Sequence, residues 1–241
     1  MPPEVNALGQ ILGFRVDGWT PPAWPPLEAM EGRTCRLEPL DLGRHGAGLH
    51  HANLLDTQHR NWTYLPYGPF AGFDDYANWL RSVAGKDDPQ FHAIVERTTG
   101  EAVGVASYLR IDPAAGSIEV GHINYSPRLQ RTIAATEAMY LMMRRAFQLG
   151  YRRYEWKCNA LNAPSRAAAQ RLGLSYEGVF RQARVDKGRN RDTAWYAAID
   201  TEWPALDRAF QRWLDPGNFD EQRRQRHSLS ALTATILVSR G

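Results

Sequence analysis

One turn in the chain combines a helix start with polar side chains, and that combination can hold a phosphate group. The turn covers residues 129–135, between an apolar, β-branched segment at 118–125 and a helical pattern whose apolar positions are Met139, Met142, Met143, Ala146 and Phe147. A helix entered from a short loop exposes free backbone N–H groups and the positive end of its dipole. Gln130, Arg131 and Thr132 add side-chain donors. The turn therefore predicts a phosphate or diphosphate site, with an ordinary strand–helix connection as the alternative.

A second group of residues suited to anions lies between positions 181 and 191. The basic residues of this segment stand against one acid, Asp186, and they are Arg181, Arg184, Lys187, Arg189 and Arg191. Clustered positive charge attracts a polyanion, such as a phosphorylated cofactor or an acidic peptide. A solvated hairpin is the alternative interpretation.

Composition limits the classes of protein to which these residues can belong. The chain has 241 residues, 43% of them hydrophobic, and a formal net charge of +3. No apolar run reaches the roughly 18 residues of a membrane helix, and the start MPPEVNALGQ lacks the features of a signal peptide. We therefore expect a cytoplasmic protein without membrane contact. Cys35 and Cys158 stand far apart, which predicts two reduced thiols and no metal site.

The order of the predicted elements indicates an α/β protein with extensions at both ends. Residues 1–32 are rich in Pro and Gly and predict an extended arm, whose Trp19 and Trp24 lie along the body or a partner subunit. Residues 33–214 predict one domain with strands at 34–38, 91–97, 102–111, 118–125, 154–158, 174–186 and 192–200. Residues 215–241 form a tail with a basic run at 223–226. Its apolar segment, 229–238, is suited to pair as a strand or to dock on a neighbouring subunit.

Four helical segments besides the one after the phosphate turn lie between or after these strands. The first is capped by Asp41 and carries Leu49, Ala52 and Leu55, and the second starts at Asp74 or Asp75. A third begins near residues 163–165 and a fourth carries Leu206, Phe210 and Trp213. Between the first two helices, the aromatic-rich loop 60–70 suits either a wall over a site or a plug at the edge of the core.

Several motifs resemble those of one enzyme superfamily. Pro127-x-x-Gln130-Arg131-x-x-x-Ala135 resembles the acyl-CoA loop of the GNAT N-acetyltransferases, with Ile133 in place of the loop's first glycine. Further segments are similar to the ribosomal-protein alanine N-acetyltransferase branch, over about residues 33–200: Ala135-Thr136-Glu137-Ala138, Glu119-Val120-Gly121, Lys157-Cys158-x-x-x-Asn162-x-x-Ser165 and Arg171-Leu172-Gly173-Leu174-x-x-Glu177-Gly178.

This resemblance implies a fold and a cofactor site. The GNAT fold has a mixed, mostly antiparallel central sheet with helices on both faces, and its fourth and fifth strands run parallel before they splay apart. Acetyl-CoA is expected to lie in that gap without any metal. The residues expected to hold it are Asn124, Tyr125, Ser126, Gln130, Arg131, Thr132, Ile133, Ala134, Ala135, Asn162 and Ser165.

The reaction implied is attack of a neutral amine on a thioester, which needs a base, an oxyanion donor and an acid for the leaving thiolate. Glu119 is our first candidate for the base, acting through a water, because a carboxylate beside an apolar strand has a raised pKa. His122 is the second, because its ordinary pKa lies near neutrality. A backbone N–H near Tyr125 suits the oxyanion, and Ser165 suits the thiolate. Asn162 and Ser165 also match a plain helix start, and Glu119 and His122 also suit buried polar residues that serve structure alone.

The acceptor is left open by the sequence. Related enzymes carry a Glu in the run Q-A-E on the sixth strand, but here Gln182-Ala183 is followed by Arg184. An arginine there favours an anionic group on the acceptor or on a longer acyl chain, such as succinyl. A protein N-terminus and a small-molecule amine both fit the family.

Two other classes of function, and assembly into a homodimer, remain as hypotheses. Ile133 and Arg184 together also fit a non-catalytic acyl-CoA-binding module that senses or scaffolds. Nucleic-acid binding through 181–191 and 223–226 is weaker, because the net charge is small, and we expect no nucleic-acid partner. The tryptophan-bearing arm and the apolar tail favour a homodimer.

Overall fold

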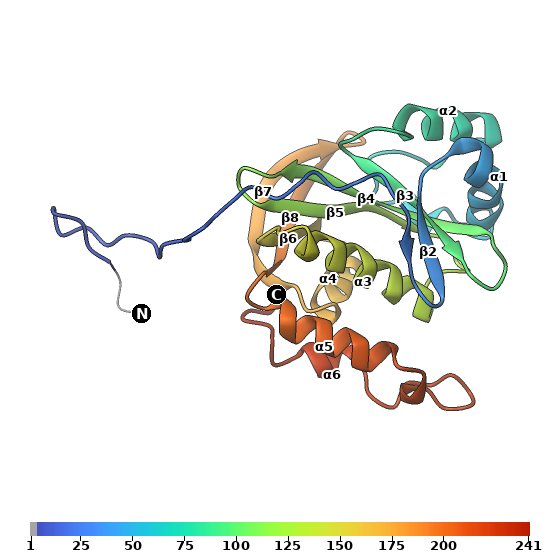
Figure 1. The fold of residues 1–241 in the computed structure, drawn as a ribbon. Helices are drawn as coiled ribbons and strands as arrows, with labels where there is room; N and C mark the ends of the chain where they lie inside the picture. The colour runs from blue at the N-terminus through green and yellow to red at the C-terminus, as the bar shows by residue number, and fades with distance from the viewer. Residues whose placement is uncertain (1–3) are drawn as a thin grey trace.

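A single sheet of eight strands forms the centre of the computed structural model, which describes residues 4–241 (Figure 1). Along the sheet the order is β1-β2-β3-β4-β5-β6-β8-β7. Only β5 and β6 pair in parallel among these strands; every other neighbouring pair is antiparallel. The bounds are β1 Met30–Glu31, β2 Cys35–Pro39, β3 Gln90–Glu96, β4 Ala102–Asp112, β5 Ser117–Tyr125, β6 Arg153–Asn159, β7 Ser175–Asp186 and β8 Arg189–Ile199. The predicted fold class, a mixed and mostly antiparallel sheet, is confirmed.

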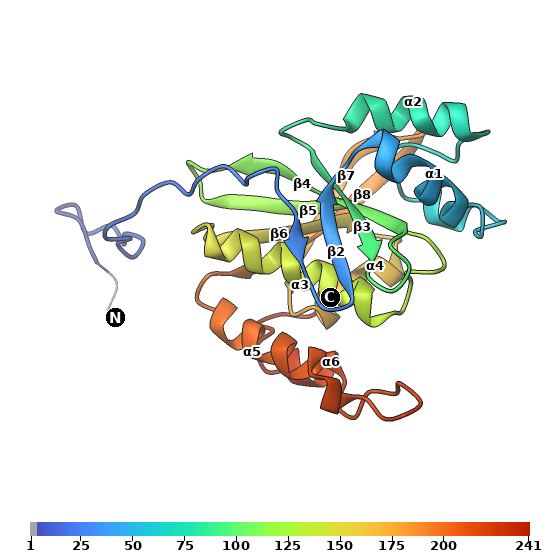
Figure 2. The same cartoon turned by 45° about the vertical axis from the view of Figure 1, so that its right-hand side comes forward.

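Helices cover both faces of this sheet (Figures 1 and 2). On one face lie α1 (Leu42–Asn53) and α2 (Phe73–Val83), and on the other lie α3 (Ile133–Gln148) and α4 (Ala163–Arg171). Beyond them, α5 (Trp203–Leu214) and α6 (Leu229–Thr233) add an outer layer, and two short 3-10 helices cover Arg60–Trp62 and Pro216–Asn218. No helix among residues 4–241 combines the length and the apolar character needed to cross a membrane.

The alternation of side chains along the strands separates two hydrophobic cores. Ile118 and Val120 of β5 pack in the larger core with α3, α4 and α5, whereas Phe91 and Val105 pack in the smaller core with α1 and α2. Glu119, between two residues of the larger core, therefore faces the side of α1 and α2.

The pairing of β5 with β6 stops halfway along β5. The parallel register runs from Ser117 opposite Arg153 to Val120 opposite Trp156 and ends there. Immediately afterwards β5 advances three residues, from Gly121 to Asn124, while β4 advances two, from Ser107 to Val105. This β-bulge turns the rest of β5 away from β6. A gap between the two parallel strands follows, as the GNAT resemblance implied.

Three sequence-based details are wrong. Leu55 lies beyond the end of α1 and is exposed, because the helix stops at Asn53 and a turn follows. The second helix begins at Phe73, earlier than Asp74 or Asp75, since Gly72 provides the extended residue before it and both acids fill its first turn. The tail segment 229–238 is no strand. Its first five residues form α6, capped by Ser228, and Leu229 and Thr233 are buried against α4 and α5 of its own chain.

The N-terminal arm is only partly attached to the body. The Trp19 ring packs on Gly116, where an added Cβ would lie 2.4 Å from the ring, and Arg152 stacks on it at 5.4 Å. Trp24 is 43% exposed, and residues 4–18 project away from the body (Figure 1). The prediction that the arm lies along the body therefore holds for Trp19, while residues 1–3 lie outside the described part of the chain.

Candidate active site

A cleft of about 1700 Å³ passes through the gap between β5 and β6 and reaches both faces of the sheet. Neighbouring residues of β6 demonstrate this: Cys158 belongs to the core beside α3, Lys157 points to the opposite face, and both line the cleft. We call the two parts the helix half and the hairpin half. The helix half includes Thr132, Ile133, Ala135, Met139, Cys158, Asn162, Ser165, Arg171 and Leu172, and the hairpin half includes Arg110, Glu119, His122, Lys157, Arg184, Arg191, Thr193 and Trp195.

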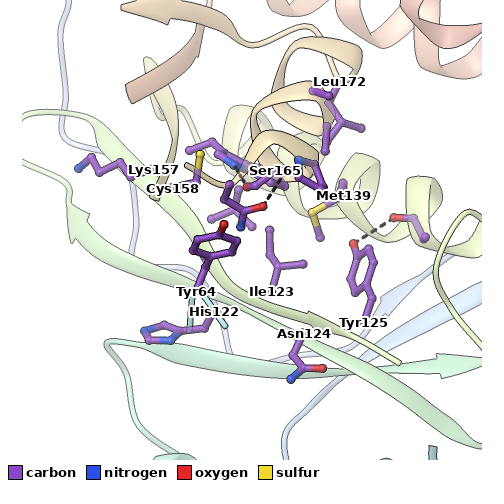
Figure 3. Close-up of a pocket in the computed structure, with 18 of the residues that line it drawn as sticks. Tyr64, His122, Ile123, Asn124, Tyr125, Met139, Lys157, Cys158, Ser165 and Leu172 are labelled. Atoms are coloured by element: carbon purple, nitrogen blue, oxygen red, sulfur yellow. Dashed lines mark hydrogen bonds between the residues drawn. The ribbon is translucent and has the colours of Figure 1, made fainter. Parts of the chain in front are cut away.

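Figure 3 shows residues that line the cleft around the gap between the strands. Met139, Cys158, Ser165 and Leu172 lie in the upper part, beside the helices, and Tyr64, His122 and Asn124 lie below them. Ile123 stands between the two groups. A ligand that fills the whole cleft must therefore cross the plane of the sheet.

The start of α3 presents free backbone donors to the helix half. Thr132 caps the helix by accepting a hydrogen bond from the Ala135 amide at 3.1 Å. No acceptor among residues 4–241 takes the amides of Arg131, Ile133 or Ala134. The Ile133 side chain packs against the larger core, so it leaves its own amide uncovered. The substitution of isoleucine for glycine thus preserves an amide cradle at this helix start.

One of the predicted loop residues, Gln130, braces the cleft wall. Gln130 Nε2 donates to the carbonyl of Tyr125 and to Asn61 Oδ1, each at 2.8 Å. Asn61 in turn donates to the same carbonyl at 3.0 Å. Arg131 is exposed and adopts a left-handed conformation with φ of 61°. Gln130 therefore fixes the loop before α3, and the side chain left free at this turn is that of Arg131.

The other predicted cofactor residues divide into those at the wall and those behind it. Asn124 and Tyr125 line the cleft, and neither polar side-chain atom of the buried Asn124 has a partner among the described residues. Tyr125 donates its hydroxyl to the Ala135 carbonyl at 3.1 Å (Figure 3). Ser126 and Ala134 do not reach the wall. Ser126 is fully buried, and its amide donates to the Val103 carbonyl.

Asn162 and Ser165 combine a structural role with a place on the cleft wall. Asn162 caps α4 by accepting a hydrogen bond from the Ser165 amide at 3.2 Å. The Trp156 indole donates to Ser165 Oγ at 3.0 Å (Figure 3). Because an indole N–H can only donate, the Ser165 hydroxyl keeps its own proton for an acceptor. The Cys158 sulfur beside it is one such acceptor, and this hydrogen bond partly offsets the rise in the pKa of the thiol that burial causes.

Glu119 lies at the centre of the hairpin half and is almost fully buried. Its Oε2 contacts Arg110 Nη1 at 2.7 Å and Lys157 Nζ at 3.0 Å, while Oε1 has no partner among the described residues. Lys157 also contacts Glu155 at 2.7 Å and stacks over the Trp195 ring at 3.8 Å. Burial raises the pKa of Glu119 in spite of the two cations.

His122 lies three residues after Glu119 on the same strand, but aromatic rings surround it. Its ring stacks on Tyr67 and packs against Phe91, with centroid distances of 5.6 Å and 5.1 Å. Burial, followed by the positive charge of Arg110, Arg184 and Arg191, lowers its pKa to about 4. The imidazole is therefore neutral at pH 7.

Strained backbone positions concentrate around this half. Arg110, His122 and Gln182 each have a positive φ, of 48°, 51° and 50°, and each lies where the register shifts in β4, β5 or β7. Non-glycine residues rarely adopt this conformation, and bulges redirect side chains next to active sites. Two of these irregularities lie in the β4–β5 pair and the third lies in the β7–β8 pair, next to the hairpin half of the cleft.

The aromatic loop serves both of the purposes that its sequence suggested. Trp62 is buried and packs edge-on against Phe70 at 5.4 Å, which plugs the smaller core. Residues 60, 61 and 63–66 line the cleft, and the Tyr64 hydroxyl donates to the Leu161 carbonyl at 3.2 Å. Lys187, at the tip of the β7–β8 hairpin, donates to the Trp62 carbonyl at 2.8 Å. The loop thus bridges the hairpin and the start of α4.

Several wall residues were not predicted as part of this site, although Arg191 belongs to the basic segment 181–191 and Arg223 to the basic run 223–226. On β8, Arg191, Thr193 and Trp195 alternate along one face, and this period of two was the available signal. From α5 and the tail come Trp213, Phe219 and Arg223. The position of tail residues next to a site depends on packing between segments far apart in the sequence, and no local sequence pattern predicts that packing. Among residues 4–241, no group of three or more His, Cys, Asp or Glu side chains is placed to hold a metal ion.

Comparisons with known proteins agree on one family. The model of the acetyltransferase (GNAT) domain matches residues 38–175. A GCN5-related N-acetyltransferase from Brucella melitensis is 44% identical and has a TM-score of 0.89, over 91% of this chain and 100% of that chain. A GNAT-family protein from Chromobacterium violaceum is 40% identical with a TM-score of 0.75, over 85% of this chain and 100% of that chain.

A more distant structure shares the fold alone. It is an acetyl transferase from Salmonella typhimurium that modifies the N-terminal serine of a 50S ribosomal subunit protein. Its identity is 21% and its TM-score 0.61, over 71% of this chain and 99% of that chain. A search among curated proteins found no match.

Proposed function

The chain belongs to the GNAT acetyltransferase family, an acyl-CoA-dependent class of transferases, and from this premise we propose that it moves an acetyl group from acetyl-CoA to a primary amine. The observation that carries the proposal is the cleft that crosses the sheet between β5 and β6, with an amide cradle in one half and a buried carboxylate in the other.

The helix half fits coenzyme A. Free amides at Arg131 and Ile133 suit its diphosphate, and Arg131, Arg171 and Arg223 add positive charge on the same side. After Val120, β5 no longer pairs with β6. The backbone along that edge of β5 is therefore free to pair with the amide-bearing pantetheine arm. Asn124, buried without a partner, suits a polar group of the same arm. Acetyl-CoA supplies an activated acyl group at this point.

Glu119 is the base in this proposal. Its Oε2 is held by Arg110 and Lys157, which leaves Oε1 to accept a proton from the amine through a water. His122 is the second candidate, but its lowered pKa makes it the weaker proton acceptor. The carboxylate is thus held in place by two cations and keeps one free oxygen.

Ser165 is the proton donor to the departing sulfur. The Trp156 indole donates a hydrogen bond to Ser165 Oγ, so the hydroxyl proton of Ser165 points away from the indole. A backbone amide near Tyr125 suits the negative charge that develops on the acyl oxygen. Amine, acyl group and sulfur then lie in order from the hairpin half to the helix half.

The acceptor and the assembly belong to the same proposal. The fold shared with the Salmonella typhimurium enzyme supports a protein N-terminus, and a small-molecule amine fits the cleft equally. We assign residues 33–214 to the catalytic domain, 1–32 to the arm and 215–241 to the tail, in a cytoplasmic enzyme. Exposed apolar residues of the arm, Leu8, Ile11 and Phe14, support a homodimer.

One experiment tests the transfer itself. Purified protein is titrated with acetyl-CoA in a calorimeter and then incubated with acetyl-CoA and a panel of primary amines, with free thiol and product mass as readouts. The proposal expects binding, thiol release that depends on the amine, and a mass gain of one acetyl group. Acetyl-CoA binding without any acetylated product would leave only the binding-module hypothesis.

A further inference from the structure

The hairpin half contains a surplus of positive charge that the acetyl-transfer chemistry does not use. Asp186 is shared between two arginines, with 2.8 Å to Arg191 Nη1 and 3.4 Å to Arg184 Nε. One carboxylate therefore faces two guanidinium groups. Glu119 is the only acidic residue among the described residues that line the cleft, and Arg110 and Lys157 already hold it.

Unpaired hydrogen-bond donors lie next to this surplus charge. Arg191 Nε, Thr193 Oγ1 and Trp195 Nε1 are shielded from solvent, and none has a partner among residues 4–241. They occupy alternate positions on β8, so all three share the face that lines the cleft. A shielded donor without a partner costs free energy, because it has lost its hydration without a replacement.

The surrounding chain directs these groups into the cleft. Between Phe180 and Arg184, β7 advances four residues while β8 advances two, and this bulge places Arg184 opposite Arg191. The Arg184 side chain is 47% exposed at the mouth, whereas that of Arg191 is 12% exposed deeper in. The positive field of both arginines reaches His122, where it adds to burial in lowering the pKa of the imidazole. Arg184, Arg191, Thr193 and Trp195 thus form one cationic, donor-rich wall.

We propose that this wall binds a carboxylate of the acceptor, so that the preferred acceptor is a small molecule that carries both a primary amine and a carboxylate. The inference rests on the proposed acetyl transfer and adds the substrate class. Guanidinium groups bind carboxylates through paired N–H donors, and the indole and hydroxyl donors supply further hydrogen bonds. Carboxylate binding would satisfy donors that are otherwise buried without a partner.

The test compares amines that differ only in the carboxylate. A panel of amino acids and their C-terminal amides is incubated with acetyl-CoA, and kcat/KM is measured for each acid and its amide. We expect the acids to be preferred by about tenfold or more, since a charge-assisted hydrogen bond contributes about 1.5–3 kcal/mol. Equal rates for acids and amides, preference for the amides, or no acetylation of any acid would overturn the inference.

Variants locate the effect. Arg184→Gln and Thr193→Val should raise KM for the acids about tenfold and leave KM for the amides and the affinity for acetyl-CoA unchanged. Arg189→Gln is the matched control, because Arg189 has the same charge and lies in the same hairpin but outside the cleft wall. Calorimetric titration of the N-acetylated acids gives a readout independent of turnover, and their affinity should fall with Arg184→Gln. Equal loss with Arg189→Gln would overturn the site.

Further arms separate the source of the carboxylate and the failure of the underlying function. Two sets of peptides, with an acidic residue or with alanine at the second position, are tested as acceptors beside the amino acids. We expect both sets to react more slowly than the amino acids. Faster reaction of the peptides with the acidic second residue would instead identify a protein N-terminus as the acceptor. Succinyl-CoA preferred over acetyl-CoA with neutral amines would place the carboxylate on the acyl chain and overturn the inference. A protein that does not bind acetyl-CoA contradicts the proposed function itself, whereas one that acetylates only amines without a carboxylate contradicts this inference alone.

Discussion

The two halves of the cleft differ in the kind of polar group that they present to a ligand. In the helix half, the polar groups are mainly backbone amides at the start of α3, and apolar side chains such as Met139 and Leu172 fill the wall. In the hairpin half, the polar groups are charged side chains from β4, β5, β6, β7 and β8. The first arrangement suits a ligand common to a family, and the second suits a ligand that differs between its members.

Removal of the Glu119 carboxylate should have the largest effect, and only on the chemistry of the hairpin half. Glu119→Gln should lower kcat by about 100-fold or more, as loss of a general base does. Acetyl-CoA affinity should stay unchanged, because the helix half is intact. Steady-state kinetics and calorimetry together measure both quantities.

Glu177→Gln is the matched control for Glu119→Gln. Glu177 lies at the exposed end of the same ionic chain, through Arg153, and does not line the cleft. Its kcat should equal that of the unaltered protein. If Glu119→Gln keeps more than a third of kcat, the base lies elsewhere and His122 becomes the first candidate.

A charge in the helix half should instead affect only the cofactor. Ile133→Asp places a carboxylate in the first turn of α3, against the proposed diphosphate, and should weaken acetyl-CoA binding by about 100-fold. An acid in the first turn interacts favourably with the helix dipole, so that loss would not reflect unfolding of α3. Ile133→Asn has the same size and loses the same packing without the charge. Equal losses for both variants would show that packing, and not repulsion, controls binding.

Ser165 lies in the helix half, and a pair of variants separates its two roles. Ser165→Ala removes the hydroxyl proton and also leaves the Trp156 indole without its acceptor. We expect kcat to fall by about tenfold and the free energy of unfolding by about 1–3 kcal/mol. Trp156→Phe should reduce stability but keep kcat within a few-fold. Similar kcat values for the two variants would argue against proton donation by Ser165.

The smallest effect concerns pH, and it should distinguish the hairpin half from the rest of the fold. The folded pKa of His122 is lowered to about 4, against about 6.5 in an unfolded chain, so the unfolded state binds more protons between these values. Stability should therefore fall as the pH drops from 6.5 toward 4, by at most about 1.4 kcal/mol per pH unit for this group.

His92 provides the comparison for this pH effect. It is fully buried in β3, outside the cleft wall, and burial lowers its pKa to about 4 as well. The free energy of unfolding is measured with urea at pH 7, 6 and 5, and its slope against pH reports the protons taken up on unfolding. His122→Gln should reduce this slope by the equivalent of up to one proton, while the contribution of His92 remains. An unchanged slope in His122→Gln would contradict a neutral, buried imidazole at this position.

The sequence predicts the helix half far better than the hairpin half, for a physical reason. Phosphate-binding amides follow from a strand, a turn and a helix that are contiguous in the chain, and Thr132 and Asn162 both match cap patterns. The order of strands also predicts the parallel pair β5–β6. These features depend on neighbours along the chain.

The hairpin half depends on contacts between strands far apart in sequence. Glu119 was predicted as a candidate, but its partners Arg110 and Lys157 come from strands on either side. Three bulges direct these side chains, and no residue pattern marks a positive φ at Arg110, His122 or Gln182. The tail is similar, since α6 is too short to be recognised by periodicity and is held by packing against α4 and α5.

The most direct test of the division between the halves is a crystal structure of the protein with coenzyme A. We predict the diphosphate against the amides of Arg131 and Ile133 and the thiol in the gap between Ile123 and Cys158, open toward Glu119. Coenzyme A bound with its diphosphate on Arg184 and Arg191, or outside the gap between β5 and β6, would contradict the assignment of both halves.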